Sequence, residues 1–408
     1  MNKVKEVLKN IKSDSNGNFL YCHYGLRQVL GMLYDAAGGL TKTEMADWKL
    51  ENVISNEATS SNKKTAIKPE AKIVQVKSKG IPRILGAGLG ALSSIQEADN
   101  NEIKNTLLSG NLLLINQDLG VKIKNEYDEL LQTKYSAKNL FYSESNLKDI
   151  VKEANDFIEE YTGGHIKNAV NEGKIKDKAV NVTNSVYFYS KWSHKLADAD
   201  NILFRNSKNN RREVEAVKGM ACKYIYNEYI HGFSYAYADR RYSFIALMLK
   251  EDNKEFCWQD IPDLDDIKPA DRNNSYICDS GENIKNAGLE IADKDVYFTM
   301  PKFKIDAEIN FDSALKAMGI KNIYDLNADL SKGFSSETGL YLSNIAQKTG
   351  IIVDENGTEG WSFTDAAVTI CIREKVELIF DKPYFFIVYD EVDKQPVFAG
   401  IVNNPQWN

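Results

Sequence analysis

The stretch from Val353 to Phe386 reads VDENGTEGWSFTDAAVTICIREKVELIFDKPYFF and combines two opposed features. It begins with an acidic bend that contains glycine, continues through small residues interrupted by Trp361 and Phe363, and ends in an apolar run. No proline lies between Pro301 and Pro383, so every backbone N–H of this region is available for a β-ladder. The stretch therefore has the composition of an exposed loop and a backbone that can still become a strand.

The composition of the 408-residue chain indicates a globular protein with ample core. Its hydrophobic content of 43% and charged content of 27% are ordinary, and its formal net charge of -7 argues against a nucleic-acid partner, which needs a basic face. The longest apolar stretch, from Ile84 to Ile95, is too short and too rich in glycine to span a membrane. The N-terminal residues lack the continuous apolar core of a signal peptide, which favours a cytoplasmic location unless an upstream signal was removed for secretion.

Residues 1–50 carry helical apolar spacing on both sides of one short strand pattern. A helix is expected first, then a strand around Phe19–Tyr21, then a second helix from about Leu26 with apolar residues on one face. Thr41 is expected to cap the next helix, because a threonine side chain can accept a hydrogen bond from a backbone N–H of the first turn. This part of the chain is therefore predicted to be mostly helical.

The rest of the chain changes from helical to strand-like patterns. Residues 51–105 are polar and irregular, which indicates a divergent, inserted or loosely ordered connection. Two more helical patterns follow, and from Val180 onward strand patterns dominate, with the helical run FDSALKAMG between two of them. Helices first and strands later favour an α+β fold over a repeating βαβ arrangement, and the lack of a clear linker favours one domain over residues 1–408.

Three short patterns carry candidate chemistry, but each has a simpler structural explanation. GAGLGA at Gly86–Ala91 resembles a dinucleotide-binding turn, yet Pro82 interrupts the preceding strand pattern and no second strand follows. Cys22 and His23 are adjacent, so on an extended segment their side chains point to opposite faces and do not pair as nucleophile and base. The basic residues from Lys68 to Arg83 suggest a polyanion site, but such runs are mostly solvated charge. No histidines are spaced as metal ligands, so we expect neither a cofactor nor a metal site, and not an enzyme.

Several longer motifs, taken in their order along the chain, resemble the serpin family of protease inhibitors. VTNSVYFYSKW at Val182–Trp192 resembles the family's central strand, and FTMPKFKIDAEINFDSALKAMGI at Phe298–Ile320 resembles its Pro-Lys-Phe strand and the helix that follows. GLYLSNIAQKTGIIVDENGTEG at Gly339–Gly360 and DKPYFFIVYDE near the C-terminus continue the likeness. The resemblance covers residues 18–405, with 51–105 aligning poorly. It implies the serpin fold, with mixed β-sheets, a large central sheet, N-terminal helices and an exposed reactive-centre loop.

The resemblance implies a suicide inhibitor whose reactive-centre loop and following strand occupy residues 357–382. A target protease cleaves the loop, which then inserts as a new strand into the central sheet and carries the acylated protease with it. The implied partner is a serine protease, with a cysteine protease as the other class, and the implied state is a metastable monomer that can polymerise by loop–sheet pairing. A non-inhibitory serpin that serves as a carrier, chaperone or storage protein is the alternative.

Insertion between two strands requires every second loop residue to fit the interior of the sheet. The inward positions, counted from Thr358, all hold small residues: Thr358, Gly360, Ser362, Thr364, Ala366 and Val368. The outward positions hold the bulky and charged residues: Glu359, Trp361, Phe363 and Asp365, followed by Ala367 and Thr369. The hinge of the loop is therefore predicted at Gly357–Gly360, and the inserted strand is predicted to continue through Val368.

Three further residues are expected to control the opening of the sheet. Trp192 is expected to pack where the loop first enters, and Asn184 matches the family's asparagine in the central strand. The family's histidine in the neighbouring strand corresponds to Gln347, and its Ser-Pro-x-Ser segment corresponds to Cys22-His23-Tyr24-Gly25, which lacks both hydroxyl groups. Because a glutamine side chain can both donate and accept, Gln347 allows a rewired hydrogen-bond network.

Family spacing places the reactive bond fourteen residues after Gly357, at Cys371–Ile372. The alternative bond, Arg373–Glu374, would suit a trypsin-like protease but needs a longer inserted segment. The acidic residue after that bond is also unfavourable for many trypsin-like enzymes. The resemblance therefore favours Cys371–Ile372 and leaves the target protease open.

Overall fold

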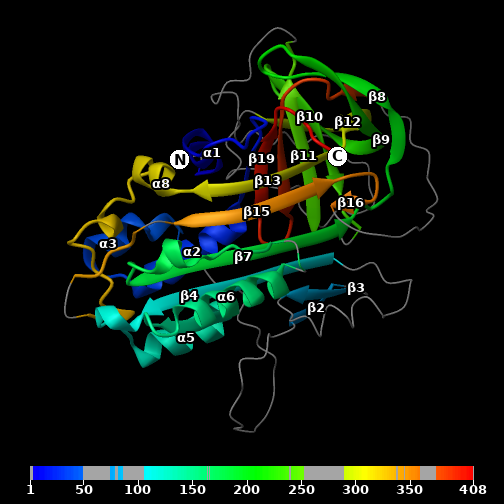
Figure 1. Cartoon of the computed structure of the whole chain (residues 1–408). Coiled ribbons are helices and arrows are strands. Elements are labelled where there is room, and N and C mark those ends of the chain that lie inside the picture. The colour runs from blue at the N-terminus through cyan, green and yellow to red at the C-terminus, as the bar shows by residue number, and fades with distance from the viewer. Residues whose placement is uncertain are drawn as a thin grey trace.

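The computed structural model describes residues 3–48, 74–78, 81–85, 105–162, 164, 166–238, 240–251, 289–336, 339–343, 345–358 and 374–407, and of 74–78, 81–85, 105, 106 and 108 the backbone alone. Figure 1 shows the arrangement of the elements. The helical elements are α1 (Lys3–Asn10), α2 (His23–Ala36), α3 (Gly39–Glu44), η1 (Ala46–Trp48), η2 (Gln117–Leu119), α5 (Asn125–Tyr135), α6 (Leu147–Tyr161), α7 (Glu172–Ile175), α8 (Asp312–Ala317) and η4 (Asn322–Tyr324). The strands up to residue 249 are β1 (Phe19–Cys22), β2 (Val74–Ser78), β3 (Ile81–Leu85), β4 (Asn105–Asn116), β5 (Lys122–Ile123), β6 (Ala137–Tyr142), β7 (Val180–Lys191), β8 (Ala197–Arg205), β9 (Arg211–Tyr226), β10 (Ile230–Ala236) and β11 (Tyr242–Leu249). The later strands are β12 (Glu290–Pro301), β13 (Phe303–Asn310), β14 (Phe334–Ser335), β15 (Ala346–Val353), β16 (Gly357–Thr358), β17 (Lys375–Ile379), β18 (Tyr384–Asp390) and β19 (Gln395–Val402).

The N-terminal elements follow the predicted order of helix, strand and helix, with two differences in detail. α2 begins at His23 rather than near Leu26, because the Sγ atom of Cys22 accepts a hydrogen bond from the Gly25 N–H at 3.3 Å and caps the helix. The prediction that Thr41 caps a helix is wrong, since Thr41 lies inside α3. Its hydroxyl instead accepts a hydrogen bond from the Asp329 N–H at 2.8 Å and so connects α3 to a distant segment.

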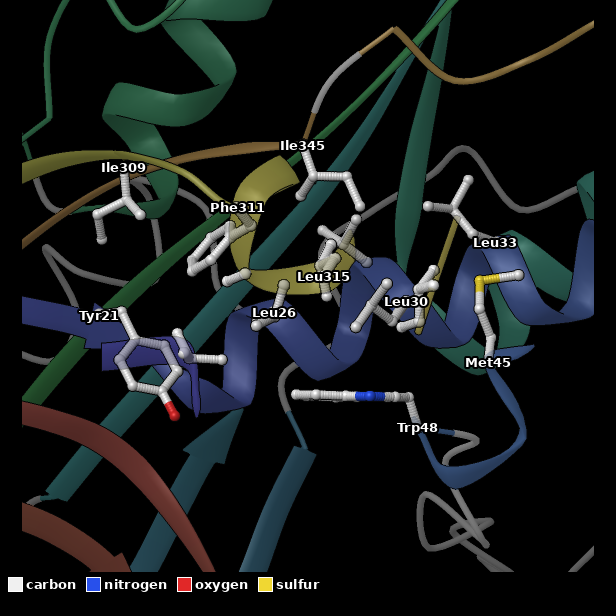
Figure 2. Close-up of a cluster of buried hydrophobic side chains, with 14 of the residues drawn as sticks. Tyr21, Leu26, Leu30, Leu33, Met45, Trp48, Ile309, Phe311, Leu315 and Ile345 are labelled. Atoms are coloured by element: carbon white, nitrogen blue, oxygen red, sulfur yellow. The ribbon is translucent and has the colours of Figure 1, made fainter. Parts of the chain in front are cut away.

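Two helical layers cover opposite faces of the sheet that contains β4. Leu112 and Leu114 of β4 pack with the apolar side of α6. Leu113 and Ile115 alternate with them and face the core built by α1, α2 and α8. Figure 2 shows the apolar side chains of α2 lying between those of α8 and the ring of Trp48. The period of two along β4 therefore explains why this strand is apolar on both faces.

The central sheet runs, in the described residues, in the order β16-β7-β4-β3-β2, with β6 paired to β4. β13 and β15 form a separate antiparallel pair, and β15 lies beside β7 in Figure 1. This division of the sheet at β7 and β15 positions the site described below.

A second, nine-stranded sheet is formed within the described ranges, in the order β1-β19-β18-β11-β10-β9-β12-β17, with β8 paired to β9. Every residue of β11 and β18 is buried, which accounts for the apolar runs YSFIALML and YFFIVYD. β17 pairs in parallel with β12. The predicted reactive-centre loop therefore connects β16 of the central sheet to β17 of the second sheet.

The expectation that residues 51–105 are irregular is wrong for two short segments. β2 and β3 pair as antiparallel strands, with Pro82 inside β3 and opposite Lys77. Pro82 therefore does not interrupt the strand, since a proline near the start of a short strand removes little hydrogen bonding. β3 ends at Leu85, and Gly86–Ala91 lie outside the described residues.

Candidate functional site

β7 and β15 form the two sides of an opening in the central sheet. They lie side by side and run in the same direction in Figure 1. β7 pairs with β4 on its far side, and β15 pairs with β13. No ladder in the described part of the chain joins β7 to β15. Both strands therefore present backbone N–H and C=O groups toward the space between them.

A cavity of about 500 Å³ lies at one end of this opening. Asn181 and Asn184 of β7, Gln347 and Lys348 of β15, and the segment 166–178 all contribute to its lining. Two buried atoms of the lining residues, Asn181 Nδ2 and Asn184 Oδ1, have no hydrogen-bond partner among the residues that the structure describes. Buried polar atoms are nearly always paired, so this end of the opening suits a group that offers both a donor and an acceptor.

The turn after β15 is held by Asp354, which lies within the turn, and by Trp192. Asp354 Oδ1 accepts hydrogen bonds from the N–H groups of Asn356 (2.7 Å) and Gly357 (3.2 Å). Trp192 Nε1 donates to the Asp354 carbonyl at 2.8 Å. The Trp192 ring is buried and stacks on Tyr237, with centroids 4.7 Å apart and planes at 10°. Trp192 thus fixes the point at which the predicted loop begins.

β16 is the first segment after this turn, and it is already paired with β7. Gly357 lies opposite Lys191, and Thr358 lies opposite Ser190, in an antiparallel register. A Cβ atom at Gly357 would lie 2.3 Å from the Ser190 carbonyl oxygen, so this close pairing requires glycine. The Thr358 side chain is buried. The entrance of the opening is therefore occupied by the first two residues of the predicted loop.

An ion-pair cluster anchors the acidic residue of the turn. Lys302 Nζ lies 2.9 Å from a carboxylate oxygen of Glu355, 2.9 Å from Asp198 and 3.9 Å from Glu215. Burial alone would raise the pKa of Glu355, but the hydrogen bond and charge of Lys302 lower that pKa below its ordinary value. The turn is therefore tied to the residue that follows β12.

Replacement of Glu355 by lysine is expected to loosen this turn. Two ammonium groups would face each other at a site where the Lys302 side chain is only 11% exposed. We expect E355K to lower the free energy of unfolding by about 2 to 3 kcal/mol, measured by urea denaturation. E215K, which changes the more distant carboxylate, should cost less than half as much. Equal losses in the two variants would contradict the anchoring role of Glu355.

Acid is expected to weaken the same turn. Because the pKa of Glu355 is lowered in the folded protein, its stabilisation is fully present above the ordinary pKa of 4.5 and is lost as the pH falls through the lowered value. Wild-type protein should therefore lose stability below that pH more steeply than E355Q, as measured by urea midpoints at each pH. Parallel profiles for the two proteins would show that the carboxylate adds nothing.

Gln347 and Asn184 lie on opposite sides of the opening but are anchored to different partners. Gln347 Oε1 accepts a hydrogen bond from the Cys22 N–H at 2.7 Å, and its Nε2 donates to the Cys22 carbonyl at 3.1 Å. Asn184 Nδ2 donates to Ser109 Oγ at 3.1 Å and to Asn111 Oδ1 at 2.9 Å. β15 is thus bound to the junction of β1 and α2, whereas β7 is bound to β4.

Gly25 lies between these two amides. A Cβ atom at this position would lie 2.1 Å from Asn184 Oδ1 and 2.8 Å from Gln347 Nε2. Both distances are shorter than any real contact of a Cβ atom, so a side chain at position 25 would collide with these amides. The glycine therefore leaves the space in which the Gln347 side chain reaches Cys22. The hydrogen bonds of Gln347 and Asn184 therefore require a glycine at position 25.

Cys22 and His23 do not form a reactive pair. Burial raises the pKa of the Cys22 thiol to about 12. His23 Nδ1 lies 3.0 Å from Tyr21 Oη, and burial lowers the pKa of the imidazole. Among the described residues there is no group of three or more potential metal ligands, and no described helix has the length and apolar character needed to cross a bilayer.

The structure describes six of the predicted site residues, which are Gly357, Thr358, Trp192, Asn184, Gln347 and Glu374. The Glu374 carbonyl accepts a hydrogen bond from the Asp295 N–H at 3.0 Å, and its carboxylate lies 3.0 Å from Lys294 Nζ. The remaining predicted residues lie outside the described ranges: Glu359, Gly360, Ser362, Thr364, Ala366, Val368, Cys371, Ile372 and Arg373.

Sequence reasoning missed Tyr237 and Lys302, and it did not predict the packing role of Gly25. Lys302 carried a usable signal, because it belongs to the Pro-Lys-Phe motif that follows β12. Tyr237 is one of 21 tyrosines and shows no distinguishing pattern. Gly25 was noted only as part of the segment that replaces Ser-Pro-x-Ser, because its packing role depends on side chains of β7 and β15 that no local pattern reveals.

The whole chain is similar to serpins. It matches the family described as serpin (serine protease inhibitor) over residues 5–405. Serine protease inhibitor 2 of Anopheles gambiae is 23% identical over 409 residues, which cover 98% of this chain and 90% of that relative. The native thermophilic serpin tengpin has a similar structure, with a TM-score of 0.70 and 21% identity over 99% of this chain and 92% of that one. Thyroxine-binding globulin in complex with thyroxine gives a TM-score of 0.63 and 18% identity over 96% and 94% of the two chains.

These similarities confirm the predicted α+β serpin fold, with its large sheets and N-terminal helices. The similar proteins include a relative named as a protease inhibitor and a globulin named for the thyroxine that it binds. A family match of this extent shows that the chain belongs to the serpin family.

Proposed function

We propose that this serpin, as one domain over residues 1–408, inhibits a protease as a suicide substrate. Cleavage within residues 359–373 would free the loop to insert between β7 and β15 and to trap the acylated protease. The observation that carries the proposal is β16, which lies antiparallel to β7 at the entrance of the opening. Since β7 and β15 run in the same direction, one antiparallel strand between them can pair with both.

Extension of β16 along β7 would give every loop residue a partner. The pairs Gly357–Lys191 and Thr358–Ser190 fix the register, so each later loop residue would face the β7 residue one position earlier. Val368 would then face Val180, the first residue of β7. Every even-numbered residue of β7 is buried, and directly opposed residues share a face. This register supports the proposal because it turns the small, even-numbered loop residues toward the interior.

The β15 side supports the same register. The Asp354 N–H donates to the Gly357 carbonyl at 3.1 Å, so these two residues face each other across the turn. Thr364 would then face Gln347 on β15 and Asn184 on β7. A threonine hydroxyl can donate as well as accept, so it would supply the partner that the buried Asn184 Oδ1 lacks in the described chain.

For the reactive bond we favour Cys371–Ile372 over Arg373–Glu374. The backbone and the carboxylate of Glu374 are both engaged at the start of β17, through Asp295 and Lys294. Exposed loop tips are the preferred sites of proteolytic cleavage. A bond next to a fixed strand is therefore the less accessible of the two.

The test is incubation of the protein with a panel of serine and cysteine proteases. We expect one protease class to form a denaturant-resistant adduct and to release a C-terminal fragment that begins at Ile372, identified by mass spectrometry. The cleaved protein should also melt at a higher temperature than the intact one. Cleavage of the loop with no adduct and no gain in heat stability would instead support a carrier, chaperone or storage protein.

A further inference from the structure

Tyr237 makes a direct contact with the first inward residue of the loop. Its hydroxyl lies 2.7 Å from Thr358 Oγ1 in a buried hydrogen bond. Tyr237 is 0% exposed and Thr358 is 2% exposed, so this bond is shielded from water. The side chain of a loop residue is thus already bound inside the sheet of the intact protein.

The ring of Tyr237 is held in place from several directions. It stacks on Trp192, and it packs edge-on against Phe188 of β7, with centroids 5.5 Å apart. Its backbone forms an isolated bridge with Trp192, and its N–H donates to the Tyr242 carbonyl at 3.0 Å. The hydroxyl therefore occupies a fixed position, and Thr358 has to adapt to it.

The contact with Tyr237 is made only when the Thr358 side chain points to this face of the strand. Side chains alternate between the two faces of a strand, so a shift of one residue would reverse every later position. Glu359, Trp361 and Phe363 would then point into the interior. Such a shift would also remove the partner of the buried Thr358 hydroxyl, and a lost partner costs more than the bond itself contributes.

We propose that Tyr237 is a positioning residue that sets the register in which the cleaved loop inserts. The proposal rests on the proposed inhibitory function, because register matters only if the loop becomes a strand. Tyr237 acts through Thr358, which precedes the predicted reactive bond in the sequence. Its effect should therefore appear in the efficiency of trapping rather than in recognition of the loop by the protease.

The other contacts of the turn have a different role. Trp192 binds the carbonyl of Asp354, and Lys302 binds the carboxylate of Glu355. Asp354 and Glu355 both precede Gly357, the first loop residue that pairs with β7. Trp192 and Lys302 hold the turn through these two residues, whereas the Tyr237 hydroxyl bonds the Thr358 side chain itself.

The test compares Y237F with Y235F in full-length protein, using the protease that forms the adduct with wild type. Tyr235 also packs against Trp192, with centroids 5.6 Å apart, but its hydroxyl donates to the His194 carbonyl instead of contacting the loop. The readout is the number of serpin molecules consumed for each protease trapped. We expect Y237F to raise this number about fivefold or more, and Y235F to change it by less than about twofold.

T358V removes the hydroxyl from the other side of the same bond and keeps the branched shape. It should match Y237F, and the double variant should be no worse than either single one, because both remove the same interaction. Melting curves of the uncleaved proteins verify that each variant is folded. Unchanged trapping by Y237F, with normal trapping by wild type, would overturn the inference and leave the inhibitory function standing. If wild type traps no protease, the proposed inhibitory function is wrong. The register inference would then be tested by melting the cleaved proteins, and equal melting temperatures of cleaved wild type and cleaved Y237F would overturn it.

Discussion

T364K should turn the proposed inhibitor into an ordinary substrate of the protease that wild type traps. In the proposed register, residue 364 faces Asn184 and Gln347, so insertion would bury an ammonium group between two amides. An unpaired buried charge costs several kcal/mol, and each 1.4 kcal/mol changes the competition between insertion and hydrolysis tenfold. We expect the number of molecules consumed for each protease trapped to rise at least about a hundredfold, measured by titration of the protease.

F363K is the matched control, because it introduces the same ammonium group one residue earlier. Position 363 belongs to the outward set, where a lysine remains in water after insertion. Trapping by F363K should therefore stay within about threefold of wild type, since a solvated charge changes little. The reverse result, with F363K inactive and T364K active, would show that the register is wrong by one residue.

G25S should destabilise the uncleaved protein by about 2 to 4 kcal/mol, measured by urea denaturation. The new Cβ would meet Asn184 Oδ1 at 2.1 Å and Gln347 Nε2 at 2.8 Å, and both side chains are buried. Relief of the collision requires Gln347 to leave Cys22, which breaks two buried hydrogen bonds. The same change should make β15 easier to separate from the core beneath it.

G173S is the control for this substitution. Gly173 lies in α7, and the nearest atom to a Cβ there is Asn171 Oδ1 at 3.5 Å, an ordinary contact distance. It should change stability by less than about 1 kcal/mol. Addition of Asn184→Ala should recover part of the loss in G25S, because it removes the closer of the two collisions. A G25S protein as stable as G173S would show that the glycine provides no needed space.

Much of the fold could be predicted from the spacing of apolar residues. The alternation of residues along β7 predicts that one of its faces is buried, and the continuous apolar runs of β11 and β18 predict burial on both faces. The errors occur where an uncommon interaction replaces the usual one. A thiol caps α2 at Cys22, and Pro82 lies inside a strand, although neither residue type favours these positions.

The candidate site could be predicted only where it depends on residues within one segment of the sequence. The small residues at every second loop position can be read from the sequence, since they depend on strand geometry alone. The contact between Tyr237 and Thr358 joins residues 121 positions apart, and that between Cys22 and Gln347 joins residues 325 positions apart. Such pairs depend on how the sheets pack, which no pattern within one segment encodes.

The length of β7 has a mechanical consequence. β7 contains 12 residues, and a loop paired from Thr358 to Val368 would span roughly 35 Å at about 3.4 Å per residue. In the proposed register Val368 would lie opposite Val180, so an enzyme joined to the chain at Cys371 would be carried to the Val180 end of β7. The length of a single strand would thus set how far along the sheet the cleaved loop can draw a captured protease.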